Sequence, residues 1–194
     1  MHKDTSSLPC IIILAAPSGS GKSTLSARLI EALPSIFFSV SATTRTPRAH
    51  EIDGEHYYFL SQKDFDAKKT AGLLLESEEV YPGCWYGTLK REIERSSAAS
   101  PVLLDIDVVG AINVKKLYGE RCLAIFIKPP SLEELRFRLS ARGTETTDSL
   151  NERIGKASKE LTFEPAFDHV VVNDHLEEAC SAVISIVRSF MRSC

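Results

Sequence analysis

The chain has 194 residues, of which 43% are hydrophobic and 25% are charged, a composition typical of one globular domain with a substantial core. Its formal net charge is −3, so no overall positive field attracts nucleic acid or an anionic membrane, and local cations must hold any anionic substrate. The sequence has no apolar run long enough to span a bilayer and no signal-peptide core near its start. We therefore expect a cytoplasmic protein that binds neither nucleic acid nor membrane.

The first predicted elements are a buried strand over residues 10–15, a glycine loop and a helix over residues 22–33. The loop follows the pattern G-x-x-x-x-G-K-[ST] in all but its first position; in this pattern glycines let backbone N–H groups approach a polyphosphate and the lysine adds a cation. Ser23 adds a hydroxyl for Mg²⁺, and the positive end of the helix points at the anion. The predicted ATP-binding residues of this phosphate loop are Ala16, Pro17, Ser18, Gly19, Ser20, Gly21, Lys22, Ser23 and Thr24.

The phosphate loop departs from the pattern at Ala16, which stands where the first glycine is expected, so a methyl group must fit the turn. A chance Gly/Ser-rich loop is disfavoured, because Gly21-Lys22-Ser23-Thr24 lies at a strand-to-helix junction. The motif alone predicts nucleotide binding and does not choose among functions.

Short β-branched runs alternate with helical patterns along the rest of the chain, which predicts an α/β fold with a parallel sheet and helices on both faces. The other strands of the expected five-stranded core cover residues 36–41, 101–106, 122–127 and 169–173. Further helices are predicted over residues 89–97, 108–117, 132–141, 150–161 and 176–191. Capping boxes at Ser131-x-x-Glu134 and Asp174-x-x-Glu177 are expected to begin two of them.

Two segments interrupt this alternation. Residues 43–88 hold hydrophobic runs on either side of a polar helical stretch and a Pro82-Gly83 turn, which predicts a small mixed sheet inserted into the parallel one. Residues 142–151 are polar and rich in Thr between two helices, as suits a lid. We expect one domain over residues 1–194, with a core of residues 1–42, 89–137 and 154–194, an inserted subdomain of residues 43–88 and a lid of residues 138–153.

The five Cys residues form no C-x-x-C pair, and their number is odd. Three of them lie in apolar patterns, where a reduced thiol packs like a small hydrophobic side chain. We expect the cysteines to be structural or incidental.

Several blocks carry a resemblance that covers nearly the whole chain, and the most specific is Ser39-Val40-Ser41-Ala42-Thr43-Thr44-Arg45-Thr46-Pro47-Arg48. The others are Asp53-Gly54-x-x-Tyr57-x-Phe59, Tyr86-Gly87-Thr88, Leu104-Asp105-Ile106-Asp107, Arg142-Gly143-Thr144-Glu145 and Val172-Asn173-Asp174. With the phosphate loop, they resemble the guanylate kinases. The resemblance implies a P-loop kinase fold with a GMP-binding subdomain and a lid. It also implies transfer of the γ-phosphoryl group of ATP to GMP, and to dGMP, in purine nucleotide metabolism.

The resemblance also implies which side chains hold the phosphate of GMP. Arg45 and Arg48 supply forked donors, and Tyr57 and Tyr86 add hydroxyl donors that carry no charge. This suits the reaction, because two anionic nucleotides must be neutralised and aligned. Taken singly, each tyrosine would be a half-buried core aromatic and each arginine a surface charge. The predicted catalytic residues are Lys22, Arg45, Arg142 and Arg153.

Choosing guanine over adenine requires an acceptor facing the N1–H and the 2-amino group, and a carboxylate meets that need. The resemblance assigns this role to Glu76, with Ser41, Thr88 and Asp107 completing the hydrogen bonds around the base. Glu78 stands where the family has a small residue, on the same strand face as Glu76, and makes the pocket more acidic. If Glu78 reads the base instead, the chemistry is unchanged.

The expected cofactor is Mg²⁺, bound with ATP as phosphoryl donor. Asp105 ends an apolar strand, where it either holds the metal through water, together with Ser23, or simply marks the strand end. Arg138, Arg142 and Arg153 are the expected lid cations, directed at the ATP phosphates. Asn173 either lines the adenine pocket, as the resemblance implies, or is a loop residue beside a helix cap.

Other functions fit parts of the pattern. A P-loop kinase for another small phosphate acceptor would use the same phosphate loop, and a noncatalytic guanylate-kinase-like module would bind a protein partner. A regulatory GTPase would need an Asn-Lys-x-Asp motif, which the sequence lacks. We expect ATP and GMP as ligands of a monomer or homodimer. No histidine is assigned as a base, because the attacking phosphate oxygen is already ionised.

Overall fold

The computed structural model describes residues 9–141 and 147–194, and its centre is a five-stranded sheet. The strand order is β2-β7-β1-β8-β9, and all neighbouring strands are parallel. The strands are β1 (Ile11–Ala15), β2 (Phe37–Phe38), β7 (Val102–Asp105), β8 (Cys122–Lys128) and β9 (His169–Val172). Every residue of β1 is buried, as expected for a central strand covered on both faces. The predicted five-stranded parallel core is confirmed.

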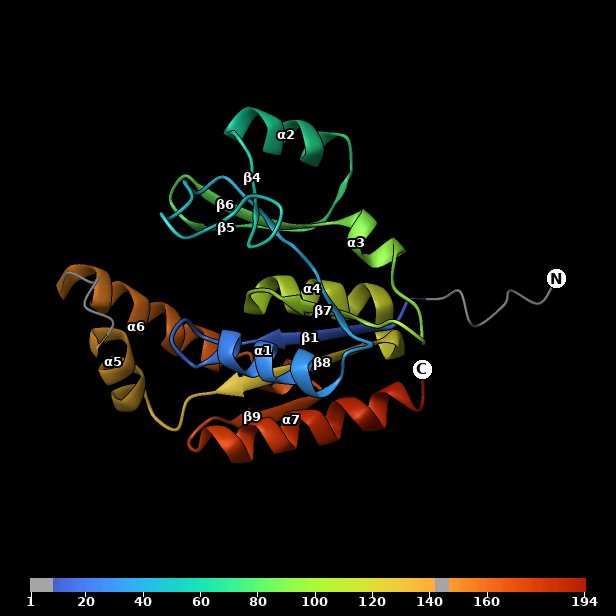
Figure 1. The fold of residues 1–194 in the computed structure, drawn as a ribbon. Helices are drawn as coiled ribbons and strands as arrows, with labels where there is room; N and C mark the ends of the chain where they lie inside the picture. Colours follow the sequence, from blue (N-terminus) through green and yellow to red (C-terminus); the bar gives the residue numbers. More distant parts are fainter. Residues whose placement is uncertain (1–8, 142–146) are drawn as a thin grey trace.

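Helices cover both faces of this sheet, as Figure 1 shows. One set of alternating β1 side chains packs in a core cluster with α1 (Lys22–Ala32) and α7 (Leu176–Met191). The other set packs in a second cluster with α4 (Val108–Tyr118). The predicted three-layer α/β fold is therefore confirmed.

Two further helices, α5 (Leu132–Ala141) and α6 (Thr147–Leu161), pack against each other at one end of the sheet. In Figure 1 they lie at the left, beside the loop that precedes α1. The Ser131 hydroxyl accepts a hydrogen bond from the backbone N–H of Glu134 at 3.0 Å, as predicted for a cap at the start of α5. Short 3-10 turns, η2 (Gly119–Arg121) and η3 (Glu164–Ala166), precede β8 and β9.

A second, four-stranded sheet has the order β4-β3-β6-β5. Its strands are β3 (Ala42–Thr43), β4 (Tyr58–Phe59), β5 (Leu74–Tyr81) and β6 (Cys84–Leu89). Strand β3 pairs in parallel with β4 and antiparallel with β6, so the sheet is mixed, as predicted. Helix α2 (Gln62–Thr70) covers it through the fully buried Phe65, and Figure 1 shows this layer above α4. The Pro82-Gly83 turn joins β5 to β6, and Gly83 takes φ 73° there.

Several predicted boundaries differ from the structure. Only two residues of the expected strand 36–41 join the parallel sheet, because the chain crosses to the second sheet at β3. The expected helix 89–97 is the short α3 (Lys90–Glu94), because Leu89 still pairs with Leu74 at the end of β6. Helix α6 begins at Thr147 and not at residue 150.

The predicted capping box at Asp174 is wrong. Helix α7 begins at Leu176, and its N-cap residue is His175, which makes no side-chain cap hydrogen bond. The preceding residue, Asn173, still follows the sheet, because its N–H donates to the Lys128 carbonyl at 2.8 Å. The turn out of β9 is therefore longer than the sequence pattern suggested.

Cys10 and Cys194 form a disulfide that the sequence did not predict. Their Cα atoms lie 6.3 Å apart, and the bond joins the residue before β1 to the last residue of the chain. The two cysteines meet because α7 runs back along the sheet to the end where β1 begins (Figure 1). Cys84, Cys122 and Cys180 are free thiols.

Among the helices that the structure describes, none is long and apolar enough to cross a membrane.

Candidate active site

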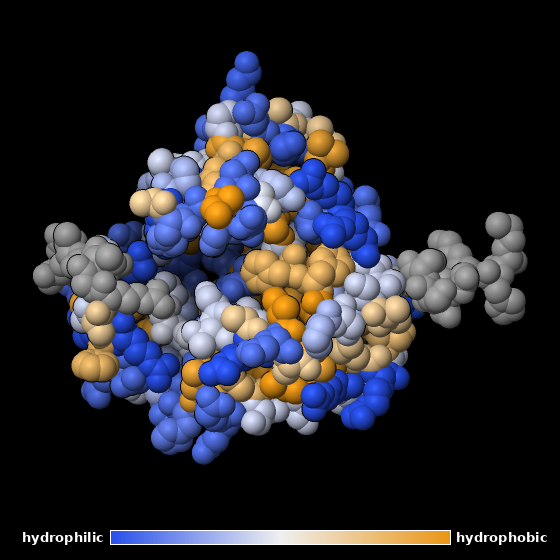
Figure 2. Space-filling model, viewed as in Figure 1, coloured by the Kyte–Doolittle hydropathy of each residue, from blue (hydrophilic) through white to orange (hydrophobic). Residues whose placement is uncertain are grey.

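A cleft of about 290 Å³ lies between the phosphate loop, the second sheet, the start of α4 and helix α6. Figure 2 shows a hollow between the upper layer and the layer of the parallel sheet, with hydrophilic residues at its edge. All residues of the predicted phosphate loop line this cleft. It is also lined by the predicted site residues Ser41, Tyr57, Glu76, Tyr86, Asp105, Asp107 and Arg153. Residues far apart in the sequence thus share one concave surface.

The phosphate loop turns through two glycines in the left-handed region, Gly19 with φ 94° and Gly21 with φ 89°. Gly21 is the N-cap residue of α1, so the first N–H groups of that helix face the cleft. No described non-glycine residue has a positive φ, and Ala16 therefore replaces the first glycine of the pattern without backbone strain. The loop has the form of an anion cradle at a helix N-terminus.

The side chain of Lys22 is bound within the protein. Its Nζ lies 2.6 Å from Oδ1 of Asp105 and donates to the carbonyl of Ile106 at 2.7 Å. A polyphosphate on the loop would compete with both acceptors for this ammonium group. The ammonium group has three N–H donors, so one donor remains beyond these two recorded contacts.

Ser23 and Asp105 bring a hydroxyl and a carboxylate to the lining of the cleft. Oxygen donors of this kind fit Mg²⁺, which binds proteins through one or two carboxylates and keeps several waters and substrate phosphates as ligands. Asp105 also accepts a hydrogen bond from the Ser26 hydroxyl at 3.4 Å, on the oxygen that Lys22 does not hold. Both oxygens of the carboxylate therefore have protein partners in this form.

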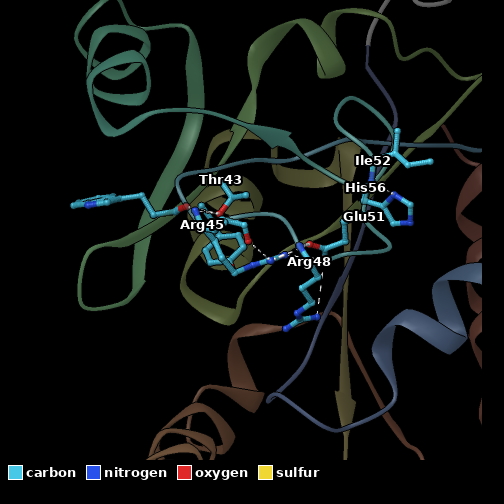
Figure 3. Close-up of polar contacts among 9 residues, drawn as sticks. Thr43, Arg45, Arg48, Glu51, Ile52 and His56 are labelled. Atoms are coloured by element: carbon cyan, nitrogen blue, oxygen red, sulfur yellow. Dashed lines mark hydrogen bonds and ion pairs between the residues drawn. The ribbon is translucent and has the colours of Figure 1, made fainter. Parts of the chain in front are cut away.

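Arg45 is held by a bidentate pair with Glu51, drawn in Figure 3. Its Nη1 and Nη2 donate to the two carboxylate oxygens at 2.9 and 2.8 Å, Nη1 also donates to the Thr46 carbonyl, and Nε donates to the Tyr86 hydroxyl at 3.2 Å. The hydrogen bonds from Arg45 lower the pKa of Glu51 to about 2, and Glu51 raises that of Arg45 in turn. The N–H of Arg48 caps the same carboxylate at 2.7 Å. Glu51 thus fixes the Arg45 guanidinium beside Tyr86, which lines the cleft, although Arg45 itself is not among the lining residues.

Tyr57 and Tyr86 form the wall beside Arg45. Their rings meet edge to face with centroids 5.8 Å apart, and the Arg45 guanidinium lies 5.4 Å from the centre of the Tyr57 ring. Burial raises the pKa of Tyr57 to about 12, so its hydroxyl stays protonated and can donate. The exposed Arg48 side chain lies outside the cleft lining, within 3.9 Å of Glu51.

Glu76 lines the cleft from β5 and is half-buried. Its Oε1 accepts from the buried Thr88 hydroxyl at 2.8 Å, a cross-strand contact between β5 and β6. Its other oxygen lies so close to α4 that a Cβ atom on Gly110 would stand 2.8 Å away. Burial raises the pKa of Glu76 to about 7, although the Thr88 hydroxyl favours the ionised form.

Asp107 is the N-cap residue of α4 and lines the same end of the cleft. Its Oδ1 accepts the N–H groups of Val109 at 3.0 Å and of Gly110 at 3.4 Å. Its Oδ2 lies 3.3 Å from Nζ of Lys156 on α6. Glu76 and Asp107 therefore both bring carboxylate oxygens, which are hydrogen-bond acceptors, to the lining of the cleft.

Arg138 and Asn173 lie outside the cleft lining. The Asn173 side chain is buried and donates to the Ser20 carbonyl at 2.7 Å, so it supports the phosphate loop from within. Arg138 binds Glu134 at 2.8 Å and the Asn173 carbonyl at 3.0 Å. These contacts connect the start of α7, α5 and the loop.

Of the two remaining predicted lid cations, Arg153 is among the described residues and Arg142 is not. Arg153 lines the cleft from α6, and its Nη1 lies 3.3 Å from the Ser18 hydroxyl of the phosphate loop. Arg142 falls outside the described residues.

Three residues near the site were not predicted from the sequence: Glu51, Lys156 and Glu160. Glu51 follows the Ser39–Arg48 block at a spacing from Arg48 that allows a local pair, which is a signal the sequence did contain. Lys156 and Glu160 lie one turn apart on α6, a spacing equally typical of an exposed helix face. Lys156 and Glu160 line the cleft because α6 packs over it, which the spacing in the sequence does not indicate.

Comparisons with known proteins agree with this geometry. The family model described as guanylate kinase matches residues 9–190. A guanylate kinase from Salinibacter ruber is 49% identical over 94% of this chain and 97% of its own length. One from Bacteroides fragilis is 47% identical over 93% of this chain and 89% of its own. The crystal structure of guanylate kinase from Anaplasma phagocytophilum superposes with a TM-score of 0.77 at 33% identity, covering 95% of this chain and 87% of that one. The chain therefore belongs to the guanylate kinase family.

Proposed function

We propose that this chain transfers the γ-phosphoryl group of ATP to GMP, forming ADP and GDP, and that the described cleft holds both nucleotides. The observation that carries the proposal is that an anion cradle and two half-buried carboxylates, Glu76 and Asp107, line one cleft. A polyphosphate fits the first, and a purine with N–H donors fits the second. The curated relatives bear the name of this activity.

The acceptor phosphate lies, in this proposal, beside Arg45, Tyr57 and Tyr86, with Arg48 reaching it from the rim. Arg45 is already oriented by Glu51, so little side-chain entropy is lost when it meets the phosphate. The two phenols add donors without adding charge. This set neutralises the acceptor enough for one of its oxygens to approach the γ-phosphorus.

Guanine lies against Glu76 and Asp107, with Thr88 fixing the Glu76 carboxylate and Ser41 lining the same cleft. Adenine offers a lone pair where guanine has N1–H and lacks the 2-amino group, so it would leave buried carboxylate oxygens unpaired. Such a mismatch costs about 1–3 kcal/mol per group. We expect discrimination against AMP of about a hundredfold or more.

The ATP phosphates lie on the phosphate loop, and Lys22 moves from Asp105 to the terminal phosphates. Arg153 and Arg142 are proposed to stabilise charge on the transferring group, while Arg138 and Asn173 support the loop that holds ATP. Loss of Lys22 releases one oxygen of Asp105. Ser23 and that oxygen would then hold Mg²⁺, directly and through water, and the ion would neutralise charge on the phosphates.

Several expectations stay predictions. These are the cytoplasmic location, the monomeric or homodimeric state, the division into core, GMP-binding subdomain and lid, and closure of residues 43–88 over the cleft to exclude water. Small-angle scattering with and without GMP plus a nonhydrolysable ATP analogue tests closure. An unchanged radius of gyration would contradict it.

A coupled assay of ADP formation with GMP, dGMP, AMP, UMP and TMP tests the proposed function. We expect turnover with GMP and dGMP and little with the others. Glu76→Gln should lose the preference for guanine, and Arg45→Ala should lose turnover. A folded protein that forms no ADP from ATP and GMP with magnesium present would refute the proposal and would favour a noncatalytic module. Preference for another acceptor would favour the second alternative.

A further inference from the structure

Tyr81 is the last residue of β5, and its side chain lines the cleft. Strict alternation along the strand would place it on the opposite face from Glu76 and Glu78, which line the cleft as well. The pairing of β5 with β6 shifts its register between Glu79 and Tyr81, as at a β-bulge. An extra residue of this kind re-aims the side chain that follows it. The irregularity therefore turns the Tyr81 ring toward the cleft.

The ring of Tyr81 meets two cations from helix α6. The guanidinium carbon of Arg153 lies 5.7 Å from the ring centroid, and Nζ of Lys156 lies 5.6 Å from it. In Figure 1 the β5–β6 hairpin lies above α6, and these contacts join the two elements. A cation within about 6 Å of an aromatic ring centroid, over the face of the ring, is attracted by the ring quadrupole. Tyr81 therefore connects the second sheet to α6.

The two cations differ in what else they contact. Nζ of Lys156 lies 3.3 Å from a carboxylate oxygen of Asp107, so an ion pair holds it besides the ring. Arg153 reaches in another direction, because its Nη1 donates to the Ser18 hydroxyl of the phosphate loop at 3.3 Å. The Arg153 guanidinium thus lies between Tyr81 on the second sheet and the loop that is proposed to hold ATP.

The position of Arg153 matters for the reaction. Charge that develops on a transferring phosphoryl group is stabilised best by cations that are already in place around it. A planar guanidinium can stack on an aromatic face while the N–H donors around its edge point elsewhere. Stacking on Tyr81 therefore restricts the rotamers of Arg153 without using the donors that a phosphate needs, and less side-chain entropy is lost when the phosphate is met.

We propose that Tyr81 is a positioning residue for phosphoryl transfer: its ring holds the Arg153 guanidinium between the second sheet and the phosphate loop. The inference rests on the proposed function and adds a residue to it. The ring face of Tyr81 performs this role, and the hydroxyl does not. The cation that depends on the ring is Arg153, and Lys156 does not depend on it.

The test measures the single-turnover rate of GDP formation, with enzyme and ATP in excess over GMP, and KM for each nucleotide. Tyr81→Leu removes the ring, and Tyr81→Phe keeps it. A series of Tyr81→Phe proteins with progressively fluorinated rings weakens the attraction for a cation with little change of shape. Tyr58→Leu is the matched control, because the Tyr58 ring has the Arg91 guanidinium 4.6 Å from its centroid, in the same sheet but outside the cleft lining.

We expect Tyr81→Leu to lower the single-turnover rate about fivefold, as for the loss of one partly exposed cation–π contact. KM for GMP and KM for ATP should stay close to the wild-type values, because Arg153 is proposed to act on the transferring group. Tyr81→Phe should keep the wild-type rate, and the rate should fall as fluorine atoms are added. Tyr58→Leu should keep the wild-type rate.

A double-mutant cycle separates the two cations. In an Arg153→Met background, Tyr81→Leu should lower the rate no further, because the side chain that the ring positions is absent. In a Lys156→Met background, the same change should still lower the rate about fivefold. The reverse pattern would assign the ring to Lys156 and overturn the inference.

Equal rates for Tyr81→Leu and the wild type would also overturn the inference, as would a rise in KM for GMP at an unchanged rate. If Tyr81→Leu is unfolded, a constant rate across the fluorinated series overturns the inference instead. Each of these results comes from an active wild-type protein and leaves the proposed function intact. A wild-type protein that forms no GDP would refute the proposed function, and the inference with it.

Discussion

Gly110 leaves room for the carboxylate of Glu76, and replacing Gly110 with alanine tests whether that carboxylate reads the base, as we propose. A Cβ atom at Gly110 would lie 2.8 Å from Oε2 and 3.2 Å from Cδ of Glu76. The carboxylate would have to retreat by roughly half an ångström to reach ordinary contact distance. The carboxylate cannot move freely, because its other oxygen accepts a hydrogen bond from the Thr88 hydroxyl at 2.8 Å.

We expect Gly110→Ala to weaken GMP binding while changing the free energy of unfolding little. Alanine is favoured over glycine in a helix by up to about 1 kcal/mol, which offsets strain in the folded protein. Under the proposed function, a displaced Glu76 weakens a hydrogen bond to guanine worth about 1.5–3 kcal/mol, so KM for GMP should rise about tenfold or more. The phosphate loop is untouched, so KM for ATP should not change.

The assay combines steady-state kinetics for both nucleotides with urea unfolding. Gly155→Ala is the matched control, because Gly155 is also in a helix and a Cβ atom there meets nothing within 4 Å. It should gain the same helix propensity without loss of GMP affinity. If Gly110→Ala stays folded and keeps the wild-type KM for GMP, Glu76 does not read the base from its position in this structure.

Three further results are expected. Lys22→Met should lower kcat/KM by at least about a thousandfold in the coupled assay, because charge on the transferring group loses its stabilising cation; activity near wild type would place the reaction elsewhere. Glu51→Gln should lower the free energy of unfolding in urea by about 1–3 kcal/mol, since Arg45 loses a charge-assisted partner, and an unchanged midpoint would show that the pair adds no stability. Burial raises the pKa of Glu160 from 4.5 to about 7 in the folded protein. The protonated carboxyl therefore stabilises the fold fully at pH values below the unfolded-state pKa, and this stabilisation is lost as the pH rises through the folded-state pKa. Unfolding free energy of the ligand-free protein should therefore fall by about 1–3 kcal/mol from about pH 5 to about pH 8, and Glu160→Gln should flatten that fall; a parallel slope in the variant would contradict the assignment.

Two cations that the proposed function assigns to phosphate groups have carboxylate partners within the protein. Lys22 is paired with Asp105, and Arg45 is paired with Glu51. Under the proposed function, a polyphosphate competes with Asp105 for Lys22, whereas the acceptor phosphate meets an arginine that Glu51 already orients. The two ends of the cleft are preorganised to different degrees.

The phosphate loop and the alternation of strands and helices could be predicted because both are local patterns. Consecutive residues determine a glycine turn at a helix start, and runs of buried β-branched residues indicate a parallel strand. Boundaries were less certain where two sheets compete for one segment, as between Phe37–Phe38 and Ala42–Thr43. There the partner strand, and not the local propensity, decides which residues pair.

The sequence alone determined that this chain is built around a phosphate-binding loop and resembles the guanylate kinases, because that information lies in short blocks of neighbouring residues. The tertiary structure decided that Lys156 meets Asp107, that Gly110 makes room for Glu76, and that Cys10 pairs with Cys194 across 184 residues. Such contacts depend on how helices pack over the sheet. Residue spacing does not predict that packing, because side chains far apart in the sequence come into contact only when the hydrophobic core forms.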